Sequence, residues 1–505
     1  MSDNLAEQAG SAIIWKAIQL VGVKGLSIGR LLVLAVILAP EDWGLVAIGA
    51  VTTELLVALT DVGINDAIIQ RKKVEDRHYD TAFTVGIVRG LLITAVVFVL
   101  APSIASLFNE PDATPVIRVL AFRPFVDALA SARVIELTRT LKFRPLTFIK
   151  VPAALIETAG IFIVLVLPAF LIESLFAIGL AATLGVWALV IGAFAGSFSG
   201  VILSYRLAPY RPRFSLAGFR ELFSFGKWVF ATRAMRNAGQ FGLRAVVSRY
   251  LGAEDLGRFY LAQKITVLPN DLVSEVVRGV AFPVLSRVQE SRSRTSRVFK
   301  ATLTAMLALL VPIYATLFVL AGPLVRQVLP DSYAGLTIVI QILAVDGIID
   351  LLTDALKPML RGQGRPRTDF FFTAVRTLLL IGLAFALTDA FGLAGAAWAW
   401  LIAEAVISVL AVIIALQVLK RPFEGMARVV AVIFLSAGLG ATLGWLVTDF
   451  FGGVAGLVLG ALISLVGGLA VLLALDRLRD FGLIRDFSKA FPQIARKIGL
   501  GDPEI

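Results

Sequence analysis

Long apolar runs with few charges recur along the chain and are separated by short polar segments. Because about 20 apolar residues in a helix cross the hydrocarbon layer of a bilayer, this pattern predicts an all-α polytopic membrane protein with about 14 transmembrane helices. We expect these helices near residues 12–38, 44–69, 81–107, 115–137, 147–168, 184–205, 226–248, 259–283, 299–321, 335–360, 369–388, 393–418, 428–448 and 454–475. The stretch 161–190, which holds Pro168 and Glu173, is also compatible with a half-helix.

Basic residues gather in alternate loops, as in the second predicted loop with Arg71, Lys72, Lys73 and Arg77. The intervening loops, such as Ala39–Trp43, carry almost no cations. By the positive-inside rule, we expect both termini to be cytoplasmic. The net charge of +11 is explained by this topology, so we expect no nucleic-acid partner.

Several classes of chemistry have no support in the composition. The chain has no cysteine, and its single histidine, His78, falls in a basic loop, which argues against thiol or metal catalysis. It contains neither a P-loop nor a dinucleotide-binding fingerprint, and the extracytoplasmic loops are too short for the catalytic groups of a membrane glycosyltransferase. We therefore expect no enzymatic activity and no cofactor.

A stripe of polar side chains crosses one of the apolar runs. Arg233, Arg236, Gln240 and Arg244 follow one another at spacings of three, four and four, which places them on one face of a helix. Since a guanidinium at bilayer depth is costly unless it meets water, a partner or a ligand, the stripe predicts a hydrated cavity suited to an anion.

An internal repeat appears when the chain is shifted by 213 residues. Eight identities then fall within residues 11–44, including Trp15 on Trp228, Gly29 on Gly242, and Glu41, Asp42 and Gly44 on Glu254, Asp255 and Gly257. The shift spans six helices, so it predicts two six-helix lobes in the same orientation, related by a pseudo-two-fold axis around a central cavity, plus two extra C-terminal helices. The expected parts are an N-lobe (1–210), an amphipathic linker (211–225), a C-lobe (226–419), helices thirteen and fourteen (420–475) and a cytoplasmic amphipathic tail (476–505). For the linker, an interfacial helix and a plain cytoplasmic segment both stay open.

Other charged residues also fall inside predicted helices. Glu54, Asp61 and Asn65 would share one face of the second helix, and Arg123 with Asp127 forms an i, i+4 pair that is compatible with a structural role. The remaining candidates are Lys24, Arg30, Arg89, Lys264 and Asp271.

Three aspartates, Asp346, Asp350 and Asp354, follow one another at spacings of four on the tenth predicted helix. Like charges on one face repel unless cations, protons or an arginine such as Arg376 lie opposite. An H⁺ or Na⁺ site for energy coupling and an ion-pair network that holds the lobes together are equally compatible with this pattern.

The motifs around these residues resemble those of the polysaccharide-transporter branch of the multidrug/oligosaccharidyl-lipid/polysaccharide flippase superfamily, that is, Wzx-like flippases including the colanic-acid type. The resemblance covers nearly the whole chain. It is carried by DVGINDAIIQRK (Asp61–Lys72), YLGAEDLGRFYLA (Tyr250–Ala262), FPVLSRVQ (Phe282–Gln289), and the VWALV and YRPRF elements around the sixth helix, in this order and spacing.

The resemblance implies a flippase that moves undecaprenyl-pyrophosphate-linked oligosaccharide repeat units from the cytoplasmic to the periplasmic leaflet for exopolysaccharide, capsule or O-antigen synthesis. It implies a multi-pass protein of the bacterial inner (plasma) membrane that works by alternating access. It also implies contact with membrane lipid and with a polysaccharide polymerase or export machinery, and we favour a monomer. A lipid II-type flippase and a multidrug exporter are the alternatives, although a cavity with arginines is poorly suited to cationic drugs.

The related lipid II flippases keep two cations six residues apart in the first helix, which Lys24 and Arg30 match. They place a further arginine in the second helix, where this chain has Ala58 and Asp61, so a coupling or gating role suits Asp61 better. The expected substrate-binding residues are Lys24, Arg30, Arg89, Arg123, Arg233, Arg236, Gln240, Arg244 and Lys264. The expected coupling or gating residues are Glu54, Asp61, Asp271, Asp346, Asp350 and Asp354.

Overall fold

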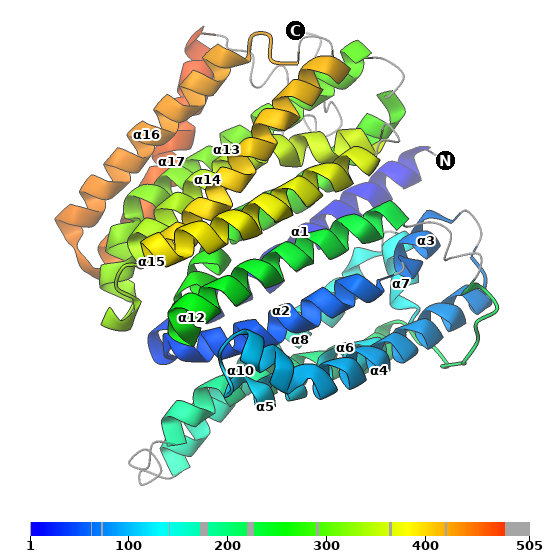
Figure 1. The fold of residues 1–505 in the computed structure, drawn as a ribbon. Coiled ribbons are helices and arrows are strands. Elements are labelled where there is room, and N and C mark those ends of the chain that lie inside the picture. The colour runs from blue at the N-terminus through cyan, green and yellow to red at the C-terminus, as the bar shows by residue number, and fades with distance from the viewer. Residues whose placement is uncertain are drawn as a thin grey trace. The chain divides into compact units, whose positions relative to one another are not determined.

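The protein is helical throughout the part that the structure describes (Figure 1). The structure is a computed structural model, and it describes residues 2–61, 63–71, 74–140, 142–171, 180–219, 227–288, 292–362, 366–419 and 422–479. No strand occurs within these residues, so the all-α fold class is confirmed.

The first half of the chain forms α1 (Ser2–Ile37), α2 (Pro40–Thr60), α3 (Ile64–Gln70), α4 (Asp76–Leu107), α5 (Ala113–Leu120), α6 (Arg123–Ala128), α7 (Val134–Arg139), α8 (Phe143–Leu171) and α10 (Leu180–Leu207). The second half forms α12 (Lys227–Val288), α13 (Arg292–Val328), the 3-10 turn η1 (Asp331–Tyr333), α14 (Leu336–Gly362), α15 (Pro366–Val418), α16 (Met426–Phe451) and α17 (Gly453–Arg479).

Two of these helices are long enough to cross a bilayer twice. α12 has 62 residues and breaks at Gly252 (φ 84°, ψ 175°), while α15 has 53 residues and breaks at Gly392 (φ 59°, ψ −140°). Both breaks use positive φ angles, which glycine adopts without the steric cost of a Cβ atom. With α12 and α15 each divided at its glycine, α3 grouped with α2, and α5–α7 taken together, the described helices form 14 groups, the number of crossings that the sequence predicts. Ten described helices are long and apolar enough to be spans by themselves.

The second predicted helix, 44–69, is wrong as a single element. α2 ends at Thr60, and Gly63 takes a left-handed conformation (φ 71°) before the separate helix α3 begins. Asp61 and Asn65 therefore do not share a helix face with Glu54, and Glu54 itself is exposed. The break places Asp61 at the open end of α2 instead of in the middle of a span.

The fourth predicted helix, 115–137, is also wrong as a single element, because α5, α6 and α7 replace it. Pro124 lies in the first turn of α6, where its missing N–H is tolerated. Between α6 and α7, Ser131 leaves the helical pattern and bonds to α10: its N–H donates to the Ser204 hydroxyl (2.9 Å) and its own hydroxyl donates to the Ala208 carbonyl (2.6 Å). These bonds satisfy backbone groups that a regular helix would pair internally.

The connection after α10 runs along α4. The Tyr210 hydroxyl donates to Asp80 (2.8 Å), and the N–H groups of Ser215 and Gly218 donate to the hydroxyls of Thr84 and Thr81. Residues 211–216 are not helical, so a plain segment describes this part of the linker better than an interfacial helix. The rest of the linker (220–225), the centre of the expected half-helix (172–179) and most of the tail (480–505) lie outside the described residues.

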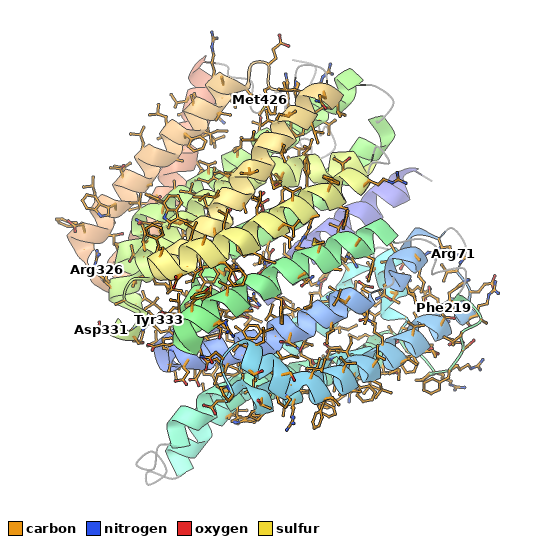
Figure 2. The ribbon with its side chains drawn as sticks, viewed as in Figure 1. Arg71, Phe219, Arg326, Asp331, Tyr333 and Met426 are labelled. Atoms are coloured by element: carbon orange, nitrogen blue, oxygen red, sulfur yellow. The ribbon has the colours of Figure 1, made fainter. Side chains whose placement is uncertain are left out.

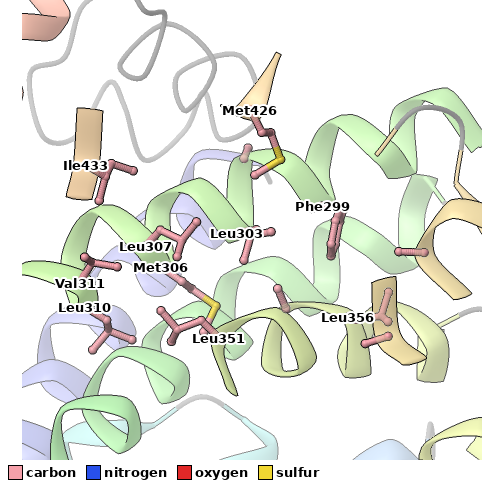
Figure 3. Packing of buried hydrophobic residues seen from close by; sticks show 14 of the residues in the cluster. Phe299, Leu303, Met306, Leu307, Leu310, Val311, Leu351, Leu356, Met426 and Ile433 are labelled. Carbon is pink, nitrogen blue, oxygen red and sulfur yellow. The ribbon is translucent and has the colours of Figure 1, made fainter. Parts of the chain in front are cut away.

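Two compact units make up the chain, Met1–Tyr260 and Leu261–Ile505. The core of the second unit joins α13, α14, α15, α16 and α17. Figure 3 shows Met306 beside Leu351, and Met426 and Ile433 on the other side of α13. In Figure 2, Arg326, Asp331 and Tyr333 lie together at one end of this unit, and Met426 lies at the opposite end. Arg71 and Phe219 mark one end of the first unit in the same view, where Phe219 packs against the cluster that contains Ile68.

The repeat appears in the first unit as a reciprocal contact. A Cβ atom on Gly44 would lie 2.0 Å from the Ala253 carbonyl oxygen, and one on Gly257 would lie 1.6 Å from the Pro40 carbonyl oxygen. The shift of 213 residues maps Gly44 onto Gly257 and Pro40 onto Ala253, so each segment presents equivalent atoms to the other. Only glycine allows the two backbones to approach this closely.

Glu110 supports this contact from the connection between α4 and α5. Its carboxylate accepts a hydrogen bond from the Ala253 N–H, directly after the Gly252 break. Burial raises the pKa of Glu110 and the negative charges of Glu41 and Asp112 raise it further, whereas the Ala253 N–H lowers it. The shift is upward overall, because the loss of hydration outweighs the single hydrogen bond.

Glu110 should make folding pH-dependent in a defined direction. Because its pKa in the folded state is raised, its stabilising contribution is complete below the unfolded value of 4.5 and is lost as the pH rises through the folded value. Glu110→Gln, which keeps an oxygen acceptor but cannot ionise, should therefore gain melting temperature relative to wild type as the pH rises from about 4.5 to 8. Melting curves of the purified protein by tryptophan fluorescence measure this, and a constant difference across the range would contradict it.

Candidate functional site

Asp61 lies between two arginines from different helices. Its Oδ2 atom is 2.6 Å from Nη1 of Arg233 on α12, and its Oδ1 atom is 3.7 Å from Nη1 of Arg89 on α4. The Gly63 N–H also donates to Oδ1 (3.1 Å), which fixes the carboxylate at the end of α2. Two guanidinium groups around one carboxylate leave an excess of one positive charge.

Arg89 pairs with Asp61 and also donates hydrogen bonds to the C-terminal end of α2. Its Nε donates to the Thr60 hydroxyl (2.9 Å) and its Nη2 donates to the Val57 carbonyl (2.7 Å), one of the carbonyls that the helix end leaves without an internal partner. The Arg89 side chain is 25% exposed, that of Asp61 26% and that of Arg233 44%. The cluster is therefore held by protein contacts on one side and is accessible on the other.

The polar stripe on α12 changes character along its length. Arg233 and Arg236 are exposed, whereas Arg244 is buried and lies over the ring of Tyr260, 5.2 Å from the guanidinium carbon to the ring centroid. From Arg233 to Arg244 the helix rises by about 16 Å, at 1.5 Å per residue. The polar stripe is therefore not uniform: its cations are accessible at the Arg233 end and enclosed by protein at the Arg244 end.

The two cations of α1 lie in different surroundings from those on α12. Arg30 forms an ion pair with Glu157 on α8 (2.7 Å), and both side chains are about one fifth exposed. Lys24 is half-buried on α1. Arg123 lies 3.9 Å from Asp127, and both side chains are more than 40% exposed, so this pair contributes little to stability.

Acidic residues of the second unit gather around one arginine. Arg376 on α15 donates to Glu404 on the same element, and its guanidinium lies 4.8 Å from the Trp400 ring centroid. The Thr353 hydroxyl bridges Glu404 (3.0 Å) and Asp350 (2.6 Å). This network brings α14 and α15 together through hydrogen-bonded carboxylates.

Asp346 is the most enclosed of the three aspartates. It is 9% exposed and accepts a hydrogen bond from Trp400, while its Oδ1 atom has no hydrogen-bond partner among the described residues. Asp350 and Asp354 share the side-chain amide of Asn270, at 3.4 Å and 3.1 Å. With Glu404 included, Asp346, Asp350 and Arg376 form a cluster of three carboxylates and one guanidinium.

The structure thus joins Asp61, Arg89 and Arg233 in the first unit, and Asp346, Asp350 and Asp354 in the second. Lys264 and Asp271 lie on the part of α12 that belongs to the second unit, where Lys264 is exposed. Sequence reasoning missed Trp43, Tyr260, Trp400, Asn270 and Thr353 as contributors to these clusters. These residues could have been found as polar or aromatic side chains inside a predicted span that also contains a charged residue. A search for charged residues alone does not find them.

Glu404 should be among the most sensitive positions for folding. Its side chain is 1% exposed and that of Arg376 19% exposed, so Glu404→Ala leaves a buried guanidinium without its carboxylate, and we expect a loss of about 3–5 kcal/mol in the free energy of unfolding. The matched control, Glu254→Ala, removes an ion pair whose carboxylate is 56% exposed and should cost less than about 1 kcal/mol. Denaturant unfolding in detergent measures both, and equal losses would contradict this assignment.

Comparisons with known proteins agree with this architecture. Residues 33–338 match the profile of the family described as Polysaccharide biosynthesis protein. The chain is 26% identical over 381 residues to the lipopolysaccharide biosynthesis protein WzxC of Escherichia coli (strain K12), a match that covers 75% of each chain. It is 24% identical over 371 residues to the succinoglycan biosynthesis transport protein ExoT of Rhizobium meliloti (strain 1021), covering 73% of this chain and 72% of that one.

Among solved structures, the inward closed conformation of the lipid II flippase MurJ superposes with a TM-score of 0.67 at 16% sequence identity, covering 92% of this chain and 100% of that chain. At this identity the likeness shows a shared fold. The family profile covers more than half of the chain, so this multi-pass membrane protein belongs to the Polysaccharide biosynthesis protein family.

Proposed function

We propose that the chain is a flippase that moves undecaprenyl-pyrophosphate-linked oligosaccharide repeat units across the bacterial inner membrane, from the cytoplasmic to the periplasmic leaflet, by alternating access, with both termini in the cytoplasm. The observation that carries this proposal is the cluster of Asp61 with Arg89 and Arg233, beside the exposed Arg236. Its geometry and charge suit an anionic group that must bind and leave again.

The cluster has the chemistry of a pyrophosphate site that is occupied by the protein's own carboxylate. Guanidinium groups bind phosphate oxygens through paired, charge-assisted hydrogen bonds. Arg89 and Arg233 already approach the two separate oxygens of Asp61, so two cations can reach one multidentate anion. Without cargo, Asp61 compensates part of their charge, and an arriving pyrophosphate would take over this role.

Asp61 therefore suits gating better than direct binding. When pyrophosphate displaces the carboxylate, the ion pair between α2 and α12 is released, and the two helices lose a direct link. Cargo binding and helix separation are then coupled, since the cargo supplies the contacts that the separation removes. Arg236, one turn beyond Arg233, is placed to share the added negative charge, and Lys24 on α1 is a further candidate.

The relatives support this substrate class through what their names say of them: WzxC is a lipopolysaccharide biosynthesis protein, and ExoT is a succinoglycan biosynthesis transport protein. Exporters of organic cations need the opposite charge at the site. A lipid II-type flippase remains the second candidate because of the cations on α1, but the pairing of Arg30 with Glu157 leaves that guanidinium already compensated.

Removal of one exposed arginine should stop transport without unfolding the protein. Arg236→Ala should lower protein-dependent translocation of a labelled undecaprenyl-pyrophosphate oligosaccharide by about tenfold or more, as expected when one hydrogen bond to a charged group, worth about 1.5–3 kcal/mol, is lost. The assay uses proteoliposomes with equal amounts of inserted protein. Arg249→Ala is the matched control, because Arg249 is an exposed arginine of the same helix on a different face.

Normal transport by Arg236→Ala would remove this residue from the site. Translocation of lipid II in preference to the oligosaccharide lipid would favour the second candidate. If the wild-type protein moved neither lipid but expelled organic cations, the flippase proposal would fail.

The acidic cluster of the second unit suits energy coupling. Three carboxylates face one guanidinium in a setting where excess charge is costly, so uptake of H⁺ or Na⁺ would compensate part of it. Thr353 and Trp400 hold Glu404 and Asp346 in place, so that a change of charge at one carboxylate alters the contacts between α14 and α15. Release of the ion on the other side of the membrane would then complete a cycle.

Asp346→Asn should change how transport depends on the ion gradient. We expect the variant to lose at least about tenfold of the stimulation by a pH or Na⁺ gradient while keeping slow, gradient-independent exchange. Proteoliposomes with each gradient imposed separately identify the ion. A matched control is Asp331→Asn, outside the span in η1. Loss of folding would instead favour the alternative of a structural ion-pair network.

A further inference from the structure

Arg244 is enclosed by protein without a hydrogen-bonded counter-ion among the described residues. It is 6% exposed, and its Nε and Nη1 atoms have no hydrogen-bond partner in that part of the chain. The side-chain oxygen of Gln240, one turn earlier on α12, is buried and is likewise without a partner there. Because an uncompensated buried guanidinium costs several kcal/mol, an anion that reached Arg244 would be stabilising there.

The acidic residues on the neighbouring segments are engaged elsewhere. Arg258 binds both Glu254 and Asp255, and Glu110 accepts the Ala253 N–H. Asp42 accepts backbone N–H groups of Ala39 and Val186 and points toward α10. Each of these carboxylates therefore satisfies another group, and Glu41, on the same segment as Asp42, is exposed. An anion from outside these segments would therefore suit Arg244.

Two aromatic rings extend the site. Tyr260 lies against the Arg244 guanidinium at 5.2 Å, and the Trp43 ring lies 6.2 Å from the Tyr260 ring. Trp43 is 6% exposed, and its Nε1 atom has no hydrogen-bond partner among the described residues. The row from Arg244 to Trp43 thus carries unused N–H donors at both ends, which suits a ligand rich in acceptor oxygens.

The repeat segments Pro40–Gly44 and Ala253–Gly257 hold the two aromatic rings beside Arg244. Trp43 belongs to Pro40–Gly44, and Tyr260 follows Ala253–Gly257 within one helical turn, so the reciprocal glycine contacts keep the two rings together. A separation of the segments moves Trp43 away from Tyr260 and opens the guanidinium to solvent. The closest approach in this contact is between backbone atoms, and the hydrogen bond from the Ala253 N–H to Glu110 supports it from the side.

We propose that Arg244, with Gln240, Tyr260 and Trp43, is a second oxyanion site that is enclosed in this conformation and becomes accessible when the segments Pro40–Gly44 and Ala253–Gly257 separate. Its ligand class is a phosphate or carboxylate oxyanion: the pyrophosphate of the cargo, or a carboxylate on an acidic sugar. This inference rests on the proposed function for the identity of the cargo. In this inference, the cargo reaches the second site after the first and shortly before its release. The second site lies about 16 Å along α12 from Arg233.

The absence of cysteine from the chain allows a direct test. Ala253→Cys introduces a single thiol at a position that is 4% exposed, and Gly44→Ala places a methyl group where only 2.0 Å separates it from the Ala253 carbonyl oxygen. We expect Gly44→Ala to raise the labelling rate of the introduced thiol by a charged reagent by at least about tenfold, since the methyl group forces the segments apart. An unchanged rate would overturn the proposed separation of the segments.

In the opened double variant, inorganic pyrophosphate and glucuronate are added separately as probes. We expect one of them to slow labelling of the introduced thiol and Arg244→Gln to weaken this protection by about tenfold, the equivalent of about 1.4 kcal/mol. Protection by pyrophosphate would identify the phosphate as the source, and protection by glucuronate an acidic sugar. Arg244→Lys keeps the positive charge, so this variant should retain part of the protection by the probe. If Arg244→Lys also lost all protection, loss of folding could explain the Arg244→Gln result.

Arg233→Gln is the matched control, because it alters the first site and should leave protection intact. Protection that is absent with both probes, or equally strong with Arg244→Gln, would overturn the second site. The outcome is separable from the proposed function: a protein that shows Arg244-dependent protection but moves no oligosaccharide lipid would contradict only the flippase proposal. Transport that needs Arg236 while labelling is never protected would contradict only this inference.

Discussion

Charge inside a bilayer has to be compensated within the protein, and this constraint determines how the helices of each unit are joined. Arg30 pairs with Glu157 across α1 and α8, Asp61 holds arginines of α4 and α12, and Arg376 binds Glu404 within α15. Contacts of apolar side chains with lipid and with protein are similar in energy, so apolar side chains favour one helix arrangement only weakly. The ion pairs and the hydrogen bonds around them distinguish partners far more strongly, because an unmatched charge is so costly.

Glycine acts on the same architecture through the backbone. The left-handed Gly63 turns the chain between α2 and α3, and this turn places Asp61 at the end of α2. Gly252 breaks α12, and Arg233 and Arg244 both lie on the segment before this break. The Gly44 and Gly257 contacts then join two repeat-related segments without any side-chain interlock. Such a contact has backbone atoms and no side chain at its centre, which suits the separation of these segments that we propose.

Much of the fold was predictable from the sequence because the strongest signal, long apolar runs, reports the bilayer directly. The failures have local causes. The 44–69 run stays apolar through Gly63, so hydropathy does not register the left-handed turn, and 115–137 contains Ser131, whose bonds to α10 outweigh helical pairing. For the site, residue types and their helices were predictable, but partners were not: 172 residues separate Asp61 from Arg233, and helix periodicity carries no information on contacts at that distance.

The two ends of the α12 stripe differ in a way that suits movement of an anion rather than its storage. If the proposed function holds, the Asp61 carboxylate would compete with the cargo at Arg233 and lower the net gain of binding, whereas at Arg244 an arriving anion would compensate a buried guanidinium. In the proposed cycle, this difference would favour transfer of the anion along α12 from Arg233, where it replaces the Asp61 carboxylate, to Arg244, where it provides a missing partner.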